Sequence, residues 1–450
     1  MPISRVDESR RRFLTQMAGV AATVVLPSGF VGCSSAGRKR LQPNIVFIMA
    51  DDLGYADVGF TGGTQATPNL DRIASEGMVL RQAYSSAPVC SPTRVALLTG
   101  RYPAREDVGL LEPLTTQATG LSPQPPTLAM LLRGAGYETA LVGKWHLGVL
   151  PAFHPLRHGF DEFYGFLGGA ADYVSHDDPV HRRSLFRDGE NEAREDGYLT
   201  DLFTQRATRI IARERVRPLF LSLQYNAPHW PWQAPGDPAY PAGSDSRAGG
   251  SPETFARMVA SLDEGVGRVL ATIDARGMAR DTLLIFTSDN GGERFSHMGP
   301  FSHGKMTLSE GGIRVAAAAR WPAVIRAGTT TDQVAATMDW TATFVALAGA
   351  VPAQELDGID LTPALRGLPP VARELCWRVS QRRQQRAVRQ GDLKLLIDEQ
   401  GERLHDVVRD PGERVDLRRE RSSDFDALRA RLAAWEAEML APLPFDPALR

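Results

Sequence analysis

The chain has 450 residues, of which 43% are hydrophobic and 23% are charged, proportions that are typical of a globular protein and exclude a disordered or fibrous chain. Lysine and arginine number 51 and aspartate and glutamate number 53, so the net charge is −2, which provides no global field for binding nucleic acid. The length fits one large α/β domain with an appendage, or two modest domains.

The first forty residues are predicted to be a signal peptide. Residues 9–15 read SRRRFLT and precede the apolar stretch MAGVAATVVLPSGFVGC, a layout of secretory signals that is too short for a membrane-spanning helix. The order S-R-R-x-F-L resembles the twin-arginine export signal, and the alternative is a frayed basic tail. Cys33 follows Gly32 as in a lipoprotein cleavage box, although Phe30 is unusual there, so lipidation of Cys33 is left open.

These features predict where the protein acts. We expect an exported protein, periplasmic or at the outer surface, with the twin-arginine translocase as a partner. No later stretch has about eighteen uninterrupted apolar residues. Any attachment to a membrane is therefore expected through a lipid at Cys33.

Four short apolar runs, which alternate with helical segments from Pro43 onward, predict a mostly parallel sheet covered on both faces. Each run ends in charged or amide side chains: NIVFIMA (44–50) before Asp51 and Asp52, TALV (139–142) before Lys144 and His146, LFLSLQY (219–225) before Asn226 and His229, and TLLIFTS (282–288) before Asp289 and Asn290. Because ligands bind beyond the carboxyl ends of parallel strands, we expect these side chains to converge. Any one of them alone could be a helix cap or a turn residue.

The acids and the amide after the first and last of these runs predict a metal site. Asp51, Asp52, Asp289 and Asn290 offer only oxygen ligands, which calcium and magnesium prefer and zinc does not. Without a cation, three carboxylates in contact would be costly unless one were protonated. We expect Ca2+ rather than Mg2+.

Cys90 stands in the string APVCSPTRVALLTGR (87–101). A proline in the first turn, several apolar residues and a final glycine predict a short helix that begins at about Ser91. Cys90 is therefore expected at a helix N-terminus, where unpaired N–H groups and the helix dipole favour an anion. Arg94, one turn further on, should face the same anion. Taken alone, Cys90 could instead be a buried core residue or an ordinary reactive thiol.

The end of the chain predicts a second, smaller α+β unit after a boundary between Leu365 and Pro370. The segments WRVSQ, RAVRQ, LKLLID and RLHDVV alternate like antiparallel strands, and apolar residues recur at helical spacing at Phe425, Leu428, Leu432, Trp435 and Met439. We expect a main domain in residues 41–367 and a four-stranded sheet with a terminal helix in residues 368–450. Three cysteines are too few for a disulfide framework, and Cys376, in the apolar RELCWRV, is predicted to be a core thiol.

The string CSPTRVALLTGR resembles the sulfatase modification motif C-x-P-x-R, in which a maturase oxidises the cysteine to formylglycine. Further strings follow the order that sulfatases show: ADDLGYADVG (50–59), TPNLDRIASEG (67–77), GKWHLG (143–148), YNAPHWPWQAP (225–235), SDNGG (288–292), HGKMTLSEGGIRV (303–315) and LHDVVRDPGERVDL (404–417). Two segments, at about residues 150–215 and 236–255, match the sulfatase pattern poorly, as expected for substrate-facing insertions.

The resemblance implies an alkaline-phosphatase-like fold, a large mixed sheet between helices followed by a small antiparallel sheet and a helix. It also implies a sulfuric ester hydrolase in which hydrated formylglycine at position 90 attacks sulfur with one hydroxyl and expels sulfate with the other. The implied metal ligands are Asp51, Asp52, Asp289, Asn290 and residue 90 itself. Arg94 and Lys144 match groups that hold the diol and the metal cluster, His146 matches the base that collapses the diol, and His229 and Lys305 match groups that bind sulfate and neutralise the leaving oxygen. The alternatives are a capping role for His229 and a solvated Lys305.

The remaining predictions concern the substrate, which is expected to be a sulfated carbohydrate or an aryl sulfate. One more sulfate-contacting group should come from residues 172–176, with His176 as the candidate. Trp145, Trp230 and Trp232 should flank the site with flat faces for a sugar or an aryl group, unless they are core residues. The rival interpretations are a phosphodiesterase or phosphonate monoester hydrolase of the same superfamily, and a non-catalytic binding lipoprotein at the cell surface.

Overall fold

The computed structural model describes residues 42–116, 118–180, 183–241 and 244–447. The predicted signal peptide and Cys33 lie outside the described residues. Within the described part of the chain, no helix combines the length and the apolar character that crossing a membrane requires.

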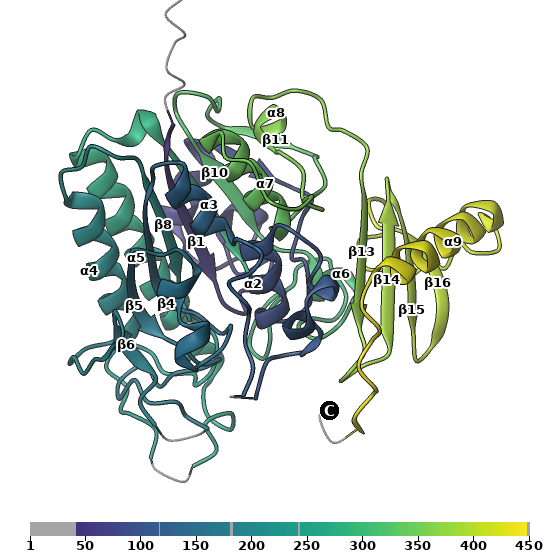
Figure 1. Ribbon diagram of the computed structural model, residues 1–450. Coiled ribbons are helices and arrows are strands. Elements are labelled where there is room, and N and C mark those ends of the chain that lie inside the picture. Colours follow the sequence, from purple (N-terminus) through teal and green to yellow (C-terminus); the bar gives the residue numbers. More distant parts are fainter. Residues whose placement is uncertain (1–41, 117, 181–182, 242–243, 448–450) are drawn as a thin grey trace, which may run out of the picture. The chain divides into compact units, whose positions relative to one another are not determined.

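A large mixed sheet organises residues 42–367 (Figure 1). Its strands are β1 (Asn44–Ala50), β2 (Met78–Leu80), β4 (Glu138–Lys144), β5 (Glu162–Phe166), β6 (Phe186–Asp188), β7 (Asn191–Glu192), β8 (Leu219–Gln224), β9 (Thr282–Ser288), β10 (Ala317–Arg320) and β11 (Thr329–Thr331). The strand order is β11-β2-β10-β9-β1-β8-β4-β5-β6-β7. The five central strands, which are β9, β1, β8, β4 and β5 in sheet order, run parallel to one another. Strands β10 and β6 pair antiparallel with their neighbours. A separate pair joins β3 (Ala83–Tyr84) to β12 (Ala335–Ala336).

Helices cover both faces of this sheet. They are α1 (Pro68–Ser75), α2 (Cys90–Thr99), α3 (Leu128–Gly134), α4 (Leu199–Ala212), α5 (Pro252–Ala275), α6 (Glu310–Ile313), α7 (Thr337–Ala348) and α8 (Thr362–Leu365). Short 3-10 helices are η1 (Gly59–Thr61), η2 (Pro103–Arg105), η3 (Asp107–Leu110), η4 (Pro151–Phe153), η5 (Pro155–His158) and η6 (Ala279–Asp281).

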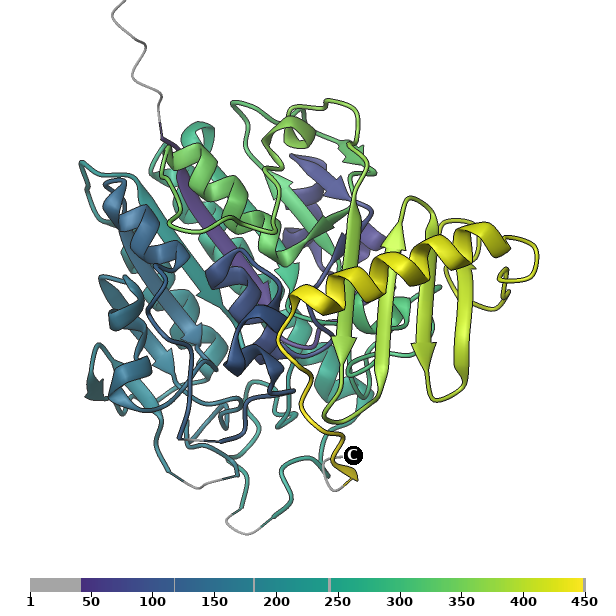
Figure 2. The ribbon, with the colours of Figure 1, turned by 45° about the vertical axis from the view of Figure 1, so that its right-hand side comes forward.

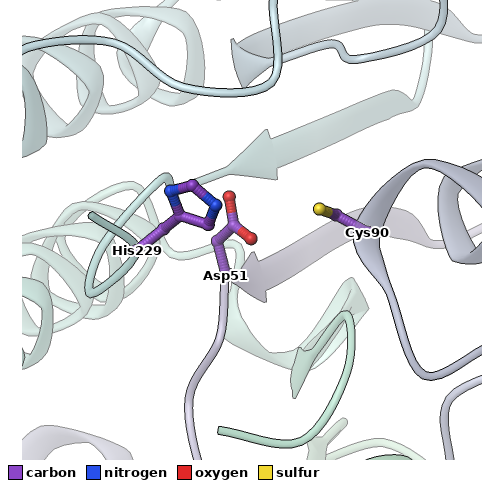
Figure 3. Close-up of side chains that lie close together, drawn as sticks. All are labelled: Asp51, Cys90 and His229. Atoms are coloured by element: carbon purple, nitrogen blue, oxygen red, sulfur yellow. The ribbon is translucent and has the colours of Figure 1, made fainter. Parts of the chain in front are cut away.

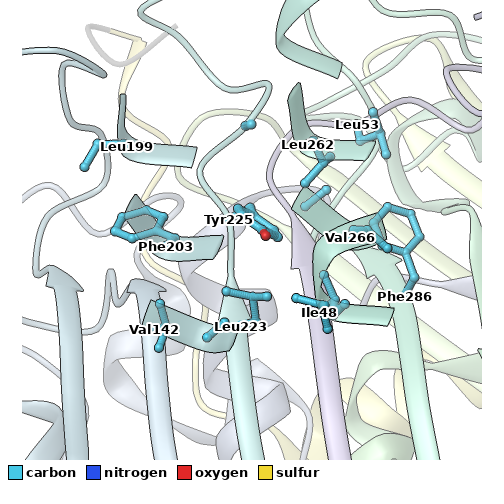
Figure 4. Close-up of a cluster of buried hydrophobic side chains, with 14 of the residues drawn as sticks. Ile48, Leu53, Val142, Leu199, Phe203, Leu223, Tyr225, Leu262, Val266 and Phe286 are labelled. Atoms are coloured by element: carbon cyan, nitrogen blue, oxygen red, sulfur yellow. The ribbon is translucent and has the colours of Figure 1, made fainter. Parts of the chain in front are cut away.

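The two layers of helices follow from the alternation of side chains along each strand. On β1, Val46 and Ile48 belong to one hydrophobic cluster with α1, α4 and α5, whereas Ile45, Phe47 and Met49 belong to another with α2, α3 and α7. Figure 4 shows part of the first cluster, in which side chains of the central strands meet those of α4 and α5. The expected α/β fold with a large mixed sheet between helices is confirmed.

The small C-terminal sheet is also confirmed. It consists of β13 (Glu374–Val379), β14 (Gln385–Gln390), β15 (Leu393–Asp398) and β16 (Gly401–Asp406), all antiparallel, and α9 (Ser422–Glu438) crosses its strands (Figure 2). Leu428, Leu432 and Trp435 of α9 are buried against this sheet, and Cys376 lies in the same cluster. Cys376 is therefore the core thiol that the sequence predicted.

A buried polar network connects the small sheet to the segment that contains α6. Lys394 on β15 donates to Glu310 and to Glu413, each at 3.0 Å. Glu310 also accepts hydrogen bonds from Tyr84 at 2.7 Å and from Arg314 at 2.9 Å. Burial raises the pKa of Glu310, but Lys394 and Arg314 outweigh it and hold this pKa at about 2. The network is therefore ionised at neutral pH, and loss of one member would leave an uncompensated buried charge.

Replacing the cation tests this network. Lys394→Met removes the charge and keeps a side chain of similar length, so we expect the free energy of unfolding to fall by about 3–5 kcal/mol in urea denaturation. Arg409→Met is the control, because the Arg409 side chain is 89% exposed and its ion pair is long, and it should change stability little. Equal effects of the two substitutions would contradict a structural role for the network.

Candidate active site

The carboxyl ends of β1 and β9 bring the predicted metal ligands together. The two strands are parallel neighbours, with Ala50 opposite Ser288, so the residues that follow them, Asp51 and Asp289, lie side by side. One carboxylate oxygen from each of Asp51, Asp52 and Asp289 lies within 4.8 Å of the other two, and all three residues are buried. The strand ends therefore converge as the sequence predicts.

Each carboxylate has a cationic partner, in the pairs Lys144–Asp51, Arg94–Asp289 at 2.8 Å and Lys305–Asp52 at 2.6 Å. Burial and the neighbouring Asp51 raise the pKa of Asp289 to about 7. Burial also raises the pKa of Asp52, but Lys305 and His229 outweigh it and lower this pKa to about 2. With no cation bound, Asp289 thus takes up a proton at a higher pH than Asp52 does.

Two oxygens in this cluster test whether a metal ion fits. Asp51 Oδ1 and Asn290 Oδ1 are buried and accept no hydrogen bond within the described chain. Asn290 is oriented by its Nδ2, which donates to Asp52 Oδ1 at 2.7 Å, so its carbonyl oxygen is the atom left available. A buried acceptor without a donor is costly, and a cation would satisfy both oxygens. Because carboxylate and amide oxygens are the ligands of hard divalent cations, the residues fit such an ion.

Cys90 is the first residue of α2 and lies beside the same cluster (Figure 3). Its Sγ lies within 4.8 Å of a carboxylate oxygen of Asp51 and of a ring nitrogen of His229. The residue is only 2% exposed. Burial raises the pKa of the thiol to about 11, although Lys144 and Lys305 act in the opposite direction. An unmodified thiol here is therefore protonated at neutral pH and is a weak nucleophile.

Arg94 is held by fixed acceptors from several strands. Its Nη1 donates to the backbone carbonyl of Lys144 at 3.1 Å and to Oε1 of Gln224 at 3.0 Å, while its Nη2 donates to Asp289. Gln224 is the last residue of β8, and the sequence analysis did not single it out. The signal that could have found it is a polar residue at the end of an otherwise apolar buried strand.

Two histidines each present one ring nitrogen with a lone pair. His229 Nδ1 lies 2.5 Å from the Trp230 carbonyl and must donate to it, and His229 Nε2 lies 3.6 Å from Asp52. His146 Nε2 donates to the Leu114 carbonyl at 3.0 Å, so its Nδ1 carries the lone pair and has no hydrogen-bond partner within the described chain. Burial lowers the pKa of both rings well below the usual value. Both are therefore neutral at pH 7 and able to accept a proton.

A cavity of about 480 Å³ lies beside these groups, and its size suits a small ligand. Its lining includes the predicted Cys90, His146, His229, Lys305 and Trp230. The two segments that match the sulfatase strings poorly also reach it, through Asp178, Val180, Leu185 and Arg247. The cavity is thus where motif residues and variable segments meet.

Two residues that were expected at the substrate lie elsewhere, which corrects the sequence analysis. Trp145 is buried in the core, where its Nε1 donates to the Phe153 carbonyl at 2.9 Å. The reason is strand alternation, because Lys144 points toward the carboxylates and the next residue must point to the opposite face. His176 is also buried, with Nε2 hydrogen-bonded to the Gly197 carbonyl at 2.8 Å. Neither residue lines the cavity, and Trp232 does not line it either.

The cavity has further charged lining residues that no sequence motif marked. They are Glu293, Arg247, Arg382 and Arg383. Arg382 and Arg383 come from the turn between β13 and β14, which reads SQRRQQ over residues 380–385. A charged run between two strands is ordinarily a solvated turn, so nothing in the local sequence could have placed these arginines at the cavity.

The fold and the site together define an α/β enzyme that acts on an anionic group. The sulfatase family model matches residues 43–350. The N-acetylgalactosamine-6-sulfatase of Canis lupus familiaris is 36% identical over 389 residues, which cover 78% of this chain and 72% of that protein. Arylsulfatase A of Bos taurus is 35% identical over 435 residues, covering 86% of this chain and 80% of that protein. The chain belongs to the sulfatase family, and it is a sulfatase enzyme.

Solved structures agree with this assignment. The crystal structure of Ps i-CgsB in complex with k-i-k-neocarrahexaose superimposes with a TM-score of 0.82 at 31% sequence identity and covers 90% of this chain and 95% of that one. The structure of PsFucS1 sulfatase from Pseudoalteromonas sp. gives a TM-score of 0.73 at 26% identity, with 88% and 90% covered.

Burial of Cys90 makes a measurable prediction for protein in which residue 90 is still cysteine. With a thiol pKa of about 11, only about a thousandth of Cys90 is thiolate at pH 8, and the residue is only 2% exposed. We expect iodoacetamide to label the Cys90 peptide at least about a hundredfold more slowly in the folded protein than in urea, as measured by mass spectrometry. Rapid labelling of the folded protein at Cys90 would contradict the geometry described for this site.

Proposed function

We propose that this sulfatase hydrolyses the sulfate ester of a carbohydrate, with formylglycine made from Cys90 and with a bound Ca2+. The observation that carries the proposal is that Cys90 opens onto a cavity beside a carboxylate cluster with two unsatisfied oxygens, Asp51 Oδ1 and Asn290 Oδ1. An anionic ester needs positive charge around it, and Lys144, Arg94 and Lys305 lie around the cluster.

A carbohydrate substrate is supported by the relatives and by the cavity. One relative is named for N-acetylgalactosamine 6-sulfate, and a solved relative is in complex with k-i-k-neocarrahexaose. Trp230 lines the cavity of this chain, and an aromatic side chain suits the face of a sugar ring. The similarity to arylsulfatase A keeps an aryl sulfate as the second substrate class.

Asp51, Asp52, Asp289 and Asn290 would hold the cation, together with residue 90. The choice of Ca2+ over Mg2+ rests on the oxygen-only ligand set and on the greater tolerance of calcium for irregular coordination. A bound divalent cation would supply a positive centre that stabilises negative charge on the sulfate oxygens. Lys144 and Arg94 would keep the carboxylates oriented, because each donates to one of them.

Formylglycine, when hydrated, would supply a hydroxyl that can attack sulfur at a position where a plain thiol is protonated. His146 would accept a proton at Nδ1, since its other nitrogen is committed to the Leu114 carbonyl. His229 Nε2 and Lys305 Nζ would face the sulfate and the leaving oxygen, and both line the cavity. A neutral histidine and a charged lysine suit these two tasks of proton transfer and charge neutralisation.

We also propose that the protein is exported through the twin-arginine translocase and acts in the periplasm or at the outer surface. The support is the SRRRFLT string ahead of a short apolar stretch. Because that translocase carries folded proteins and Cys90 is buried in the folded chain, oxidation of Cys90 by the maturase should precede export.

Peptide mass spectrometry of protein from its native host tests the nucleophile. We expect residue 90 to be formylglycine in exported protein and in the folded cytoplasmic precursor. Cys90→Ala should lower turnover of a sulfated sugar at least about a thousandfold, because the covalent route is lost. Fully active protein with an unmodified cysteine would overturn the mechanism.

Faster turnover of phosphate than of sulfate esters on the same preparation would favour the phosphodiesterase alternative.

Metal removal tests the cation site. We expect a calcium chelator to abolish turnover and Ca2+ to restore it. At a Ca2+ concentration one hundred times its Kd, the free energy of unfolding should rise by about 2.7 kcal/mol. Asp51→Asn should weaken Ca2+ binding in calorimetry, whereas Asp426→Asn, an exposed acid on α9, should leave it unchanged. If Ca2+ alters neither the stability nor the turnover of chelator-treated enzyme, the calcium proposal fails.

A further inference from the structure

Three arginines from two distant segments line the cavity in addition to the predicted site residues. Arg382 and Arg383 belong to the turn between β13 and β14, and Arg247 precedes α5. We call Arg247, Arg382 and Arg383 the arginine rim. Two of its arginines come from the small sheet and one comes from the variable segment of residues 236–255, so the rim forms only in the folded chain.

The turn that carries Arg382 and Arg383 is fixed in place. The carboxylate of the buried Glu112 accepts hydrogen bonds from the backbone N–H of Ser380 at 2.9 Å and of Gln381 at 3.0 Å. The residues that follow Glu112, from Pro113 to Thr116, line the cavity themselves. The turn that carries the two arginines is therefore held at the cavity by two hydrogen bonds to a buried carboxyl group.

Arg247 is placed by an aromatic contact on the same cavity. Its guanidinium lies 4.5 Å from the centroid of the Trp230 ring, a cation–π arrangement. Glu293 lines the same cavity. Burial raises the pKa of Glu293, while the charges of Lys305 and Arg247 oppose that rise.

Two acids, Glu293 and Asp178, line the cavity together with the three arginines of the rim. Asp178, the other acid of the cavity, is buried and accepts a hydrogen bond from the backbone N–H of Val180 at 2.8 Å. Burial and the like charge of Arg247 lower the pKa of Arg382, whereas Glu112 and Cys90 raise it. Arg382 and Arg247 line the same cavity and repel each other, and an anion between the two arginines would relieve this repulsion.

We propose that the arginine rim is a second anion site, which binds a further anionic group of the same sulfated saccharide. The preferred substrate is then a polyanionic saccharide, whose second anion is either another sulfate or the carboxylate of a uronic acid. Guanidinium groups suit both, because they pair with planar or tetrahedral oxyanions through two parallel hydrogen bonds. This inference rests on the proposed function and specifies its substrate class.

Competition against a small reporter tests the rim in the formylglycine-bearing, calcium-loaded enzyme. The reporter is 4-nitrophenyl sulfate, which has no second anion. The competitors are N-acetylgalactosamine 6-sulfate, the same sugar with a second sulfate, and the same sugar linked to a uronic acid. We expect at least one of the two dianionic saccharides to inhibit at about tenfold lower concentration than the monosulfated sugar, and the stronger of the two identifies the second group.

Substitutions in the rim then locate the effect. Arg382→Gln and Arg383→Gln should each raise the inhibition constant of that dianionic saccharide about ten- to a hundredfold, as loss of a charge-assisted contact does. They should raise that inhibition constant by a larger factor than they lower kcat/KM for 4-nitrophenyl sulfate, because the reporter carries a single anion. Arg386→Gln is the matched control, since Arg386 lies on the adjacent strand and pairs with Glu436 on α9, away from the cavity.

The outcomes separate this inference from the function on which it rests. If the enzyme turns over 4-nitrophenyl sulfate but the dianionic and monosulfated saccharides inhibit it equally, the second anion site is wrong and the sulfatase mechanism stands. The same conclusion follows if Arg386→Gln changes the inhibition as much as the rim substitutions do. Absence of turnover in wild-type enzyme that carries formylglycine and Ca2+ would overturn the proposed mechanism, and the rim with it. Weakened inhibition by all three saccharides alike would show a general charge effect and would also contradict a second anion site.

Discussion

The crowding of three buried carboxylates within 4.8 Å of one another is the constraint on which the rest of the site depends. At an effective dielectric constant of about 20, two unit charges 4 Å apart repel by about 4 kcal/mol, and the register of β1 with β9 places Asp51 and Asp289 side by side. The fold balances the cluster with cations from three different places: Lys144 at the end of β4, Arg94 on α2 and Lys305 in the segment before α6. Of these three cations, Lys305 also lines the cavity, so one of the charges that balance the cluster is available to an anion bound there.

The small sheet supports this site although it contains none of the residues predicted to act there. Glu413, after β16, accepts hydrogen bonds from the hydroxyl of Ser302 at 2.8 Å and from the backbone N–H of Glu310 at 2.7 Å. These two contacts lie on either side of Lys305 in the chain, and Lys394 pairs with Glu413 at 3.0 Å. The turn between β13 and β14 reaches the cavity directly. The small sheet thus influences both the cation beside Asp52 and the outer wall of the cavity.

The carboxylate cluster could be predicted from sequence because the rule behind it is local. Polar residues directly after buried parallel strands must meet at one edge of the sheet, so Asp51 and Asp289 could be paired without knowledge of any tertiary contact. The arginine rim could not be predicted, since its members lie 135 residues apart and only tertiary packing joins the turn at Arg382 to Arg247. The prediction that Trp145 flanks the substrate went wrong for a different reason. A motif shows which residues stand together in the chain, whereas alternation along the strand decides which of them faces the site. The left-handed φ angles of Asp52 and His146, 63° and 57°, likewise have no sequence signal, because either residue type is common in ordinary backbone.

Cys90 is enclosed by parts of the chain that are synthesised long after it. The backbone N–H of Met306 donates to the Pro88 carbonyl at 2.8 Å, and β1 is flanked by β8 and β9. A ribosome that adds about 5–20 residues per second needs on the order of 10–40 s to pass from position 90 to position 306. Throughout that interval the cysteine lies on an incomplete chain whose cover does not yet exist. If Cys90 is oxidised as proposed, the distance along the chain between the two halves of the site and the rate of translation together set how long an oxidising enzyme would meet Cys90 on an incomplete chain.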